Sequence, residues 1–188
     1  MEEIRTYFEE HYGISTSDWA IFSSKLHRKE LKKKETLLDV GQVENHLSYI
    51  EQGIVRQYIP LETDDLTFGF MFSGSFVSGY DSFLTKKPSE YKLEALTEVV
   101  VWQLSYEGLQ EVYESSQIGN LIGRKASEDL YLKKSKREIS LLRYSAEERY
   151  LKLFEERPEL IREIPLKYIA SYIGVTPQAL SRIRRRIS

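Results

Sequence analysis

Residues 166–187 read LKYIASYIGVTPQALSRIRRRI, a segment whose apolar residues follow a fixed spacing. With Leu166 as position 1 of a 20-residue window, the apolar positions 4, 8, 10, 15 and 18 are Ile169, Ile173, Val175, Leu180 and Ile183. Position 5 is Ala170, which is small enough for two helices to approach closely. Position 9 is Gly174, where a tight turn needs a positive φ. Seven constrained positions therefore agree with a helix-turn-helix over residues 166–185.

The predicted second helix, at about 177–187, has the capping chemistry that this motif needs. Thr176 is a suitable N-cap, and Pro177 occupies the first helical position, where a missing N–H costs nothing. The helix is expected to bury Leu180, Ile183 and Ile187. The opposite face carries side chains that can read bases in a major groove, namely Gln178, Ser181 and Arg182. Groups suited to contact phosphates are Lys167, Thr176, Arg184, Arg185 and Arg186.

The formal net charge of −2 conceals a division between the two ends of the chain. Residues 141–188 hold ten Lys/Arg and six Asp/Glu, a balance of +4, whereas residues 1–140 have a balance of −6. From Ile164 onward there are five basic residues and no acidic one. A basic module attached to an acidic one favours nucleic-acid binding by the C-terminal part. A two-helix protein-docking module, the alternative for this segment, has no need of such a charge excess.

The remaining chain predicts helices at both ends of a strand-rich region. Residues 1–29 read as two helices, the second carrying Leu26. Residues 30–104 contain short β-branched or alternating runs, which favour a sandwich or barrel; they are 47–51, 54–59, 66–72, 91–96 and 99–104. Residues 106–140 suit one or two long helices. Their apolar stripe is expected either to pair with a second copy or to pack on the β domain; it consists of Leu109, Val112, Tyr113, Ile118, Ile122, Ala126 and Leu130. A capping box at 145–148 opens a further helix, which Pro158 ends or interrupts.

Composition excludes several kinds of site. The absence of cysteine rules out disulfides, a thiol nucleophile, thiolate zinc sites and iron–sulfur clusters, and it suits a reducing compartment. The three histidines, His11, His27 and His46, argue against a multi-histidine metal centre or a haem ligand. No apolar run reaches the roughly 20 residues of a membrane span, and the N-terminus lacks the features of a signal peptide. We therefore expect a cytoplasmic protein without cofactors, metal sites or catalytic residues.

Three segments resemble the CRP/FNR (catabolite activator) superfamily. The segment 165–184 resembles its helix-turn-helix, 50–56 its opening β-roll strands, and 83–91 its phosphate-cassette region. The resemblance implies an α+β bacterial transcription regulator with a β-roll sensor domain (1–105), a long dimerisation helix (106–140) and a DNA-binding domain (141–188). It also implies that Pro177, Gln178 and Arg182 are base readers. Since proline has no side-chain donor, base reading should fall on Gln178, Ser181 and Arg182.

The sequence departs from the cyclic-nucleotide-binding members of that family. The Gly-Glu pair that binds the ribose is missing from 76–81, and Glu90 and Tyr91 lie near the position expected for the phosphate-binding arginine. A carboxylate beside the phosphate would oppose binding, so we expect no tight binding of cyclic AMP, although Lys92 is a possible replacement. Either another small molecule or a filled core is expected near the candidate ligand residues Phe76, Ser78, Gly79, Tyr80, Ser89, Tyr91 and Lys92. The usual β-hairpin wing is also expected to be absent.

Three readings of the function compete, the third being a protein-interaction module that uses the β domain, with DNA binding secondary. The first is a homodimeric regulator that binds a near-palindromic double-stranded DNA site, with RNA polymerase and an unknown small molecule as further candidate partners. Its two recognition helices would enter successive major grooves about 34 Å apart. The second is a small-molecule-binding or metal-dependent β-roll enzyme, which would need two or three histidines and a carboxylate around one metal. His46 is the one histidine among the predicted strands, and this favours the regulator.

Overall fold

The computed structural model describes residues 1–116 and 119–187, which form two compact units. The first contains Met1–Tyr58 and Gly69–Ala126, and the second contains Ile59–Phe68 and Ser127–Ser188. Ile118, part of the apolar stripe predicted above, lies outside the described residues. The chain passes from the first unit to the second between Ala126 and Ser127, within the segment predicted as a long helix, and residues 59–68, between two strands, also belong to the second unit.

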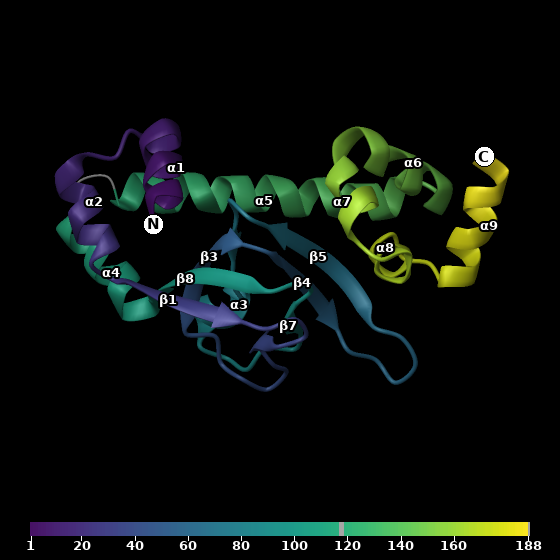
Figure 1. Ribbon diagram of the computed structural model, residues 1–188, viewed down its shortest axis with the longest axis horizontal. Coiled ribbons are helices and arrows are strands. Elements are labelled where there is room, and N and C mark those ends of the chain that lie inside the picture. Colours follow the sequence, from purple (N-terminus) through teal and green to yellow (C-terminus); the bar gives the residue numbers. More distant parts are fainter. Residues whose placement is uncertain (117–118, 188) are drawn as a thin grey trace. The chain divides into compact units, whose positions relative to one another are not determined.

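The N-terminal unit is built on two four-stranded sheets (Figure 1). One has the order β1-β8-β3-β6 and the other β2-β7-β4-β5. Their strands are β1 (Leu26–Leu31), β2 (Thr36–Leu38), β3 (His46–Gln52), β4 (Ile54–Ile59), β5 (Leu66–Phe72), β6 (Phe76–Val77), β7 (Lys92–Ala95) and β8 (Val99–Ser105). Strand β8 is antiparallel to β1 and β3, and β7 is antiparallel to β2 and β4. The predicted antiparallel β-roll is therefore confirmed, with a buried aliphatic cluster that includes Ile50, Val55, Leu93 and Val101.

Gly53 directs the chain from one sheet to the other. It lies between β3 and β4, which belong to different sheets, and its φ is 99°. A Cβ at this position would lie 2.3 Å from the carbonyl oxygen of Glu98. Both the backbone conformation and the lack of space therefore require glycine here.

Among the described residues, several helices lie wholly within this unit and flank the roll, and one of them, α3, was not predicted. They are α1 (Glu2–Tyr12), α2 (Thr16–Ser23), α3 (Tyr80–Thr85) and α4 (Tyr106–Ser115). Leu26, predicted to lie on the second helix, instead begins β1 and pairs with Leu104. The four central residues of β1 are all exposed, so its sequence lacks the alternation that identifies a strand.

The first half of the predicted apolar stripe belongs to the core of the roll. Leu109 and Val112 on α4 are buried in one cluster with Ile4 and Phe8 of α1, and Ile122 packs against it. This part of the stripe therefore packs on its own β domain, which was one of the two expectations above. The exposed apolar residues lie further along, on the next helix.

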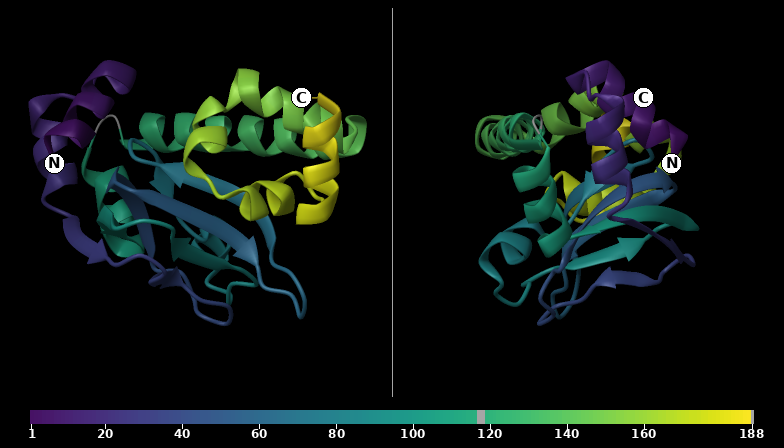
Figure 2. Two further views of the ribbon diagram at one scale, coloured as in Figure 1. Left: turned by 45° about the vertical axis from the view of Figure 1, so that its right-hand side comes forward. Right: turned by 90° about the vertical axis from the view of Figure 1, so that its left-hand side faces the viewer.

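The C-terminal unit is helical apart from the β4–β5 tip, residues 59–68 (Figure 2). Helix α5 (Gly119–Arg143) runs into it from the first unit and is followed by α6 (Ala146–Glu156), α7 (Pro158–Glu163), α8 (Leu166–Tyr172) and α9 (Pro177–Ile187). The predicted capping box is present, since Ser145 Oγ accepts from the Glu148 N–H and the Glu148 carboxylate accepts from the Ser145 N–H. Pro158 begins α7, directly after α6 ends.

Candidate nucleic-acid interface

The turn between α8 and α9 has the predicted geometry. Gly174 has a φ of 77°, and its N–H donates to the Ser171 carbonyl at 3.1 Å. The Val175 N–H donates to the Ala170 carbonyl at 2.9 Å, so the last turn of α8 closes on itself. Thr176 Oγ1 then accepts from the Ala179 N–H at 3.2 Å and caps α9. Local chemistry thus fixes where α8 ends and α9 begins.

Burial agrees with the predicted motif at most positions. The fully buried residues of the two helices and their turn are Ile169, Ala170, Ile173, Leu180 and Ile183. Val175 is half-buried. Ile187 was expected in the core but is 37% exposed. It lies in the last turn of α9, after the buried residues Leu180 and Ile183.

The outer face of α9 borders an open groove of about 500 Å³. The groove is lined by the first residue of α6 and by one side of α9; its residues are Ala146, Val175, Ala179, Arg182, Ile183, Arg185 and Arg186. Among the described residues, Arg182 and Arg185 form no hydrogen bond or ion pair with one another or with other side chains. The groove therefore presents positive charge above an apolar floor.

The other predicted DNA contacts lie outside this groove. Pro177, Gln178, Ser181 and Arg184 are exposed on α9, and Lys167 is exposed on α8 with its Nζ 4.6 Å from the centre of the Tyr168 ring. Thr176 is exposed and its hydroxyl serves as the α9 cap. The structure thus gathers three predicted arginines at one groove and distributes the remaining predicted residues along the exposed face.

Two arginines that sequence reasoning did not identify hold the helix-turn-helix in place. Arg149 on α6 donates through Nε to the Ile173 carbonyl at 2.9 Å, and through Nη1 to the Tyr144 carbonyl. Arg137 on α5 donates to the Tyr172 carbonyl at 2.6 Å, and its guanidinium lies 3.8 Å from the centre of the Tyr172 ring. Burial lowers the pKa of Arg137. Both arginines satisfy carbonyls at the end of α8, and nothing in their local sequence distinguishes them from surface charges.

The β4–β5 tip is a further contact of α8 that the sequence did not predict. Ser171 Oγ accepts from the Thr67 N–H at 2.7 Å and donates to the Asp65 carbonyl at 2.5 Å. Lys134 on α5 places its Nζ 5.0 Å from the centre of the Phe68 ring. The first helix of the motif is therefore bound to a segment about 100 residues earlier in the chain.

The first group of candidate ligand residues in the roll has internal partners. The centre of the Phe76 ring lies 5.3 Å from the centre of the Tyr49 ring and 6.0 Å from the centre of the Phe8 ring. The Tyr80 ring is stacked 6.1 Å from Phe83. Ser78 Oγ donates to the His46 carbonyl at 2.9 Å. These contacts belong to the packing of α1 and α3 on the roll.

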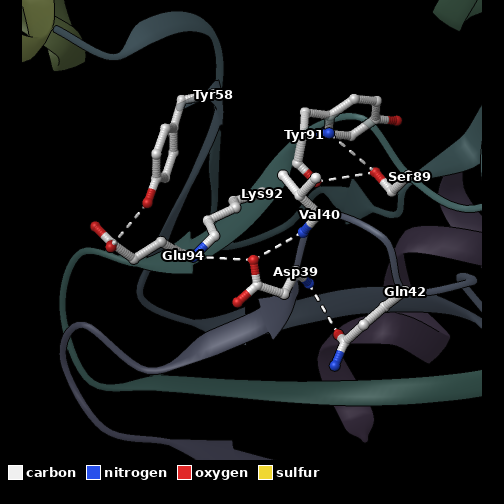
Figure 3. A network of polar contacts seen from close by, with 8 residues as sticks. All are labelled: Asp39, Val40, Gln42, Tyr58, Ser89, Tyr91, Lys92 and Glu94. Atoms are coloured by element: carbon white, nitrogen blue, oxygen red, sulfur yellow. Dashed lines mark hydrogen bonds and ion pairs between the residues drawn. The ribbon is translucent and has the colours of Figure 1, made fainter. Parts of the chain in front are cut away.

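The second group takes part in a polar network around Asp39 (Figure 3). Lys92, the possible replacement for the phosphate-binding arginine, forms an ion pair with Asp39 at 2.9 Å. Hydrogen bonds from Lys92 and from the Val40 N–H lower the pKa of Asp39. Ser89 Oγ donates to the Tyr91 carbonyl at 2.9 Å, and Tyr91 donates its phenolic proton to Asp81. The Lys92 charge is therefore balanced within the chain.

A buried carboxylate accepts a hydrogen bond from the backbone N–H at the start of α3. Glu44 is 6% exposed, and it accepts from the Gly79 N–H at 3.2 Å and from the His46 N–H at 2.9 Å. A Cβ at Gly79 would lie 2.3 Å from a methyl group of Leu38. Of the candidate ligand residues, Gly79 is thus closely packed and already hydrogen-bonded to an anion.

Comparison with known proteins shows which proteins have a similar fold. Residues 28–116 match the family model of the cyclic nucleotide-binding domain. A search of curated proteins finds no match. Among solved structures, the c-di-GMP-responsive global regulator CLP of Xanthomonas campestris is 20% identical, with a TM-score of 0.70 over 92% of this chain and 91% of that one.

Two further structures have the same fold. A putative transcriptional regulator of the crp/fnr family from Eubacterium rectale is 16% identical, with a TM-score of 0.73 over 96% of this chain and 87% of that one. FixK2 of Bradyrhizobium japonicum is 15% identical, with a TM-score of 0.72 over 86% and 84% of the two chains. The resemblance that the sequence indicated is thus confirmed for the fold.

Other kinds of site were searched for across the described residues. No group of three or more His, Cys, Asp or Glu side chains there is placed to hold a metal ion. In residues 1–116 and 119–187, no helix combines the length and apolar character that crossing a bilayer requires.

Proposed function

We propose that this chain, which has the fold of the CRP/FNR regulators, binds double-stranded DNA through α9 and regulates transcription as a homodimer. The observation that carries the proposal is the helix-turn-helix itself, with Arg182 and Arg185 exposed beside an open groove. A capped helix with unpaired arginines on its outer face suits the width of a major groove. In this proposal Gln178, Ser181 and Arg182 read bases. The phosphates are contacted by Lys167, Thr176, Arg184, Arg185 and Arg186.

The dimer part of the proposal is supported by an exposed apolar stripe on α5. Leu132 is 62% exposed, Ile139 is 52% exposed and Leu142 is 81% exposed. Leu132 and Ile139 are seven residues apart, and Leu142 follows three residues later, which is the a and d spacing of a coiled coil. A second copy carries the same stripe, so two α5 helices can cover each other's apolar residues. Two recognition helices would then address two half-sites of a near-palindromic sequence.

Replacement of Arg182 tests the base-reading role. In a binding titration on the promoter of its own operon, Arg182→Ala should lose about ten- to a hundredfold in affinity and relax discrimination at one base pair of each half-site. The matched control is Arg162→Ala, which removes an exposed arginine from α7 in the same unit. Unchanged affinity and discrimination in Arg182→Ala, with the protein folded, would show that this residue does not read a base.

We further propose that the roll does not bind cyclic AMP tightly. Two observations support this: Lys92 is paired with Asp39, and the Gly79 amide is engaged by the Glu44 carboxylate. A cyclic phosphate entering here would have to displace one carboxylate and approach another. Titration calorimetry with cyclic AMP should give no binding in the micromolar range. A micromolar dissociation constant would contradict this part of the proposal.

A further inference from the structure

The C-terminal unit brings an acidic side chain to the arginines of α9. Glu147 lies in the first turn of α6, directly after Ala146, which lines the groove beside α9. Its carboxylate forms an ion pair with Arg186, which lines the same groove. The neighbouring Glu148 is engaged in the capping box instead. Residues 164–188 contain no acidic residue, so this negative charge reaches α9 only through the fold.

We infer that Glu147 competes with the DNA backbone for Arg186 and thereby lowers the affinity of the protein for every duplex. The inference rests on the proposed function, and it concerns how the affinity of that same interface is set. A guanidinium binds a carboxylate and a phosphate with the same paired geometry, so the two are alternative partners. The Glu147 and Arg186 side chains are 36% and 66% exposed, so their pair is weak enough for a phosphate to displace.

The consequence is specific to contacts with the backbone. A phosphate contact is present at every sequence, whereas base contacts are present only at the correct site. Removal of the Glu147 charge should therefore strengthen binding to specific and non-specific duplexes by the same factor. Discrimination between them should be unchanged. This pattern separates Glu147 from Arg182, whose loss should reduce discrimination.

The test compares E147Q with E155Q. Both variants remove one negative charge from α6, but Glu155 is exposed near the other end of that helix. Affinities for a specific and a scrambled duplex are measured by fluorescence anisotropy over a range of salt concentrations. Each E147Q substitution should raise the affinity for both duplexes about two- to fivefold relative to E155Q, counted for one protomer of the dimer. The slope of log K against log[salt] should be the same for the two variants, because Arg186 contacts a phosphate in both complexes and the slope counts the phosphates that are neutralised.

A second substitution distinguishes competition from a structural role. In the R186Q background, E147Q should have no greater effect than E155Q, because no guanidinium remains to be released. Thermal unfolding of each variant accompanies the binding assays. A lower midpoint in E147Q without tighter binding would assign the pair to stability alone and overturn the inference.

The outcomes also separate this inference from the proposed function. If the unaltered protein binds neither duplex at low ionic strength, DNA binding itself is wrong and the inference falls with it. If the unaltered protein binds both duplexes and E147Q matches E155Q in affinity, the inference alone is overturned. Equal strengthening of both duplexes by E147Q, lost in the R186Q background, supports it.

Discussion

Replacement of Ile139 and Leu142 by lysine should separate the proposed homodimer into monomers and weaken its binding to a near-palindromic duplex by at least about a hundredfold. Both side chains lie on the exposed stripe of α5. Lysine at these positions would place four like charges at the seam between two copies of the helix. Covalent or stable linkage of two binding modules raises the overall affinity by about 10²- to 10⁴-fold, and this gain is lost when the modules separate.

The measurement pairs sedimentation equilibrium with anisotropy on a full site and on a half-site. The variant should sediment as a monomer of 22.1 kDa and bind the two duplexes with similar, weak affinity. The matched control replaces Leu61 and Leu84 by lysine, because both leucines are exposed and lie off the stripe. If the variant of α5 remains a dimer while the control behaves like the parent, the dimer is formed by another surface.

Replacement of Arg149 by leucine will unfold the helix-turn-helix while the β-roll remains folded. The side chain donates to the carbonyl of Ile173, which directly follows α8. It also donates to the carbonyls of Leu141, in the last turn of α5, and of Tyr144, directly after that helix. A hydrogen bond to a charged group contributes about 1.5–3 kcal/mol, so loss of the two shorter ones should cost roughly 3–6 kcal/mol. That is a large fraction of the stability of a small unit.

The two tryptophans make this prediction easy to follow. Trp19 and Trp102 both lie in the N-terminal unit, so tryptophan fluorescence reports the roll, whereas far-ultraviolet circular dichroism reports the helices of both units. In Arg149→Leu, the helical signal should be lost at a lower temperature than the fluorescence change. Arg162→Leu should behave like the parent. A single, unshifted transition in Arg149→Leu would mean that these carbonyls find other partners.

Much of the architecture was predictable because it is encoded over short distances in the chain. Gly174, Thr176 and Pro177 define the turn and the start of α9 through φ preference and capping, which act within three or four residues. The capping box at Ser145, the alternation in β5 and the β-branched, apolar run of β8 are likewise local signals. Strand β1 was missed because it is exposed along its centre and has no alternation to detect.

The candidate site was predictable as a set of exposed residues but not as an arrangement. Arg182, Arg185 and Arg186 follow from the exposed, basic part of α9, whose buried residues are Leu180 and Ile183. Their gathering at a groove with Ala146, and the pairing of Arg186 with Glu147, join residues 39 positions apart in the chain. The candidate ligand residues of the roll were identified from a resemblance. No local pattern singles out Glu44 and Asp39, the partners of Gly79 and Lys92.

Local spacing therefore established a basic helix-turn-helix, its caps, the strand-rich region and the charge difference between the two ends of the chain. The fold in space established the rest: the β4–β5 tip bound to Ser171, the anchoring of α8 by Arg137 and Arg149, and the acidic neighbour of Arg186. The physical reason is the distance along the chain over which each kind of interaction acts. Propensity, capping and periodicity act between near neighbours. The hydrogen bond of Ser171 with Thr67 joins residues 104 positions apart and exists only after the chain has packed.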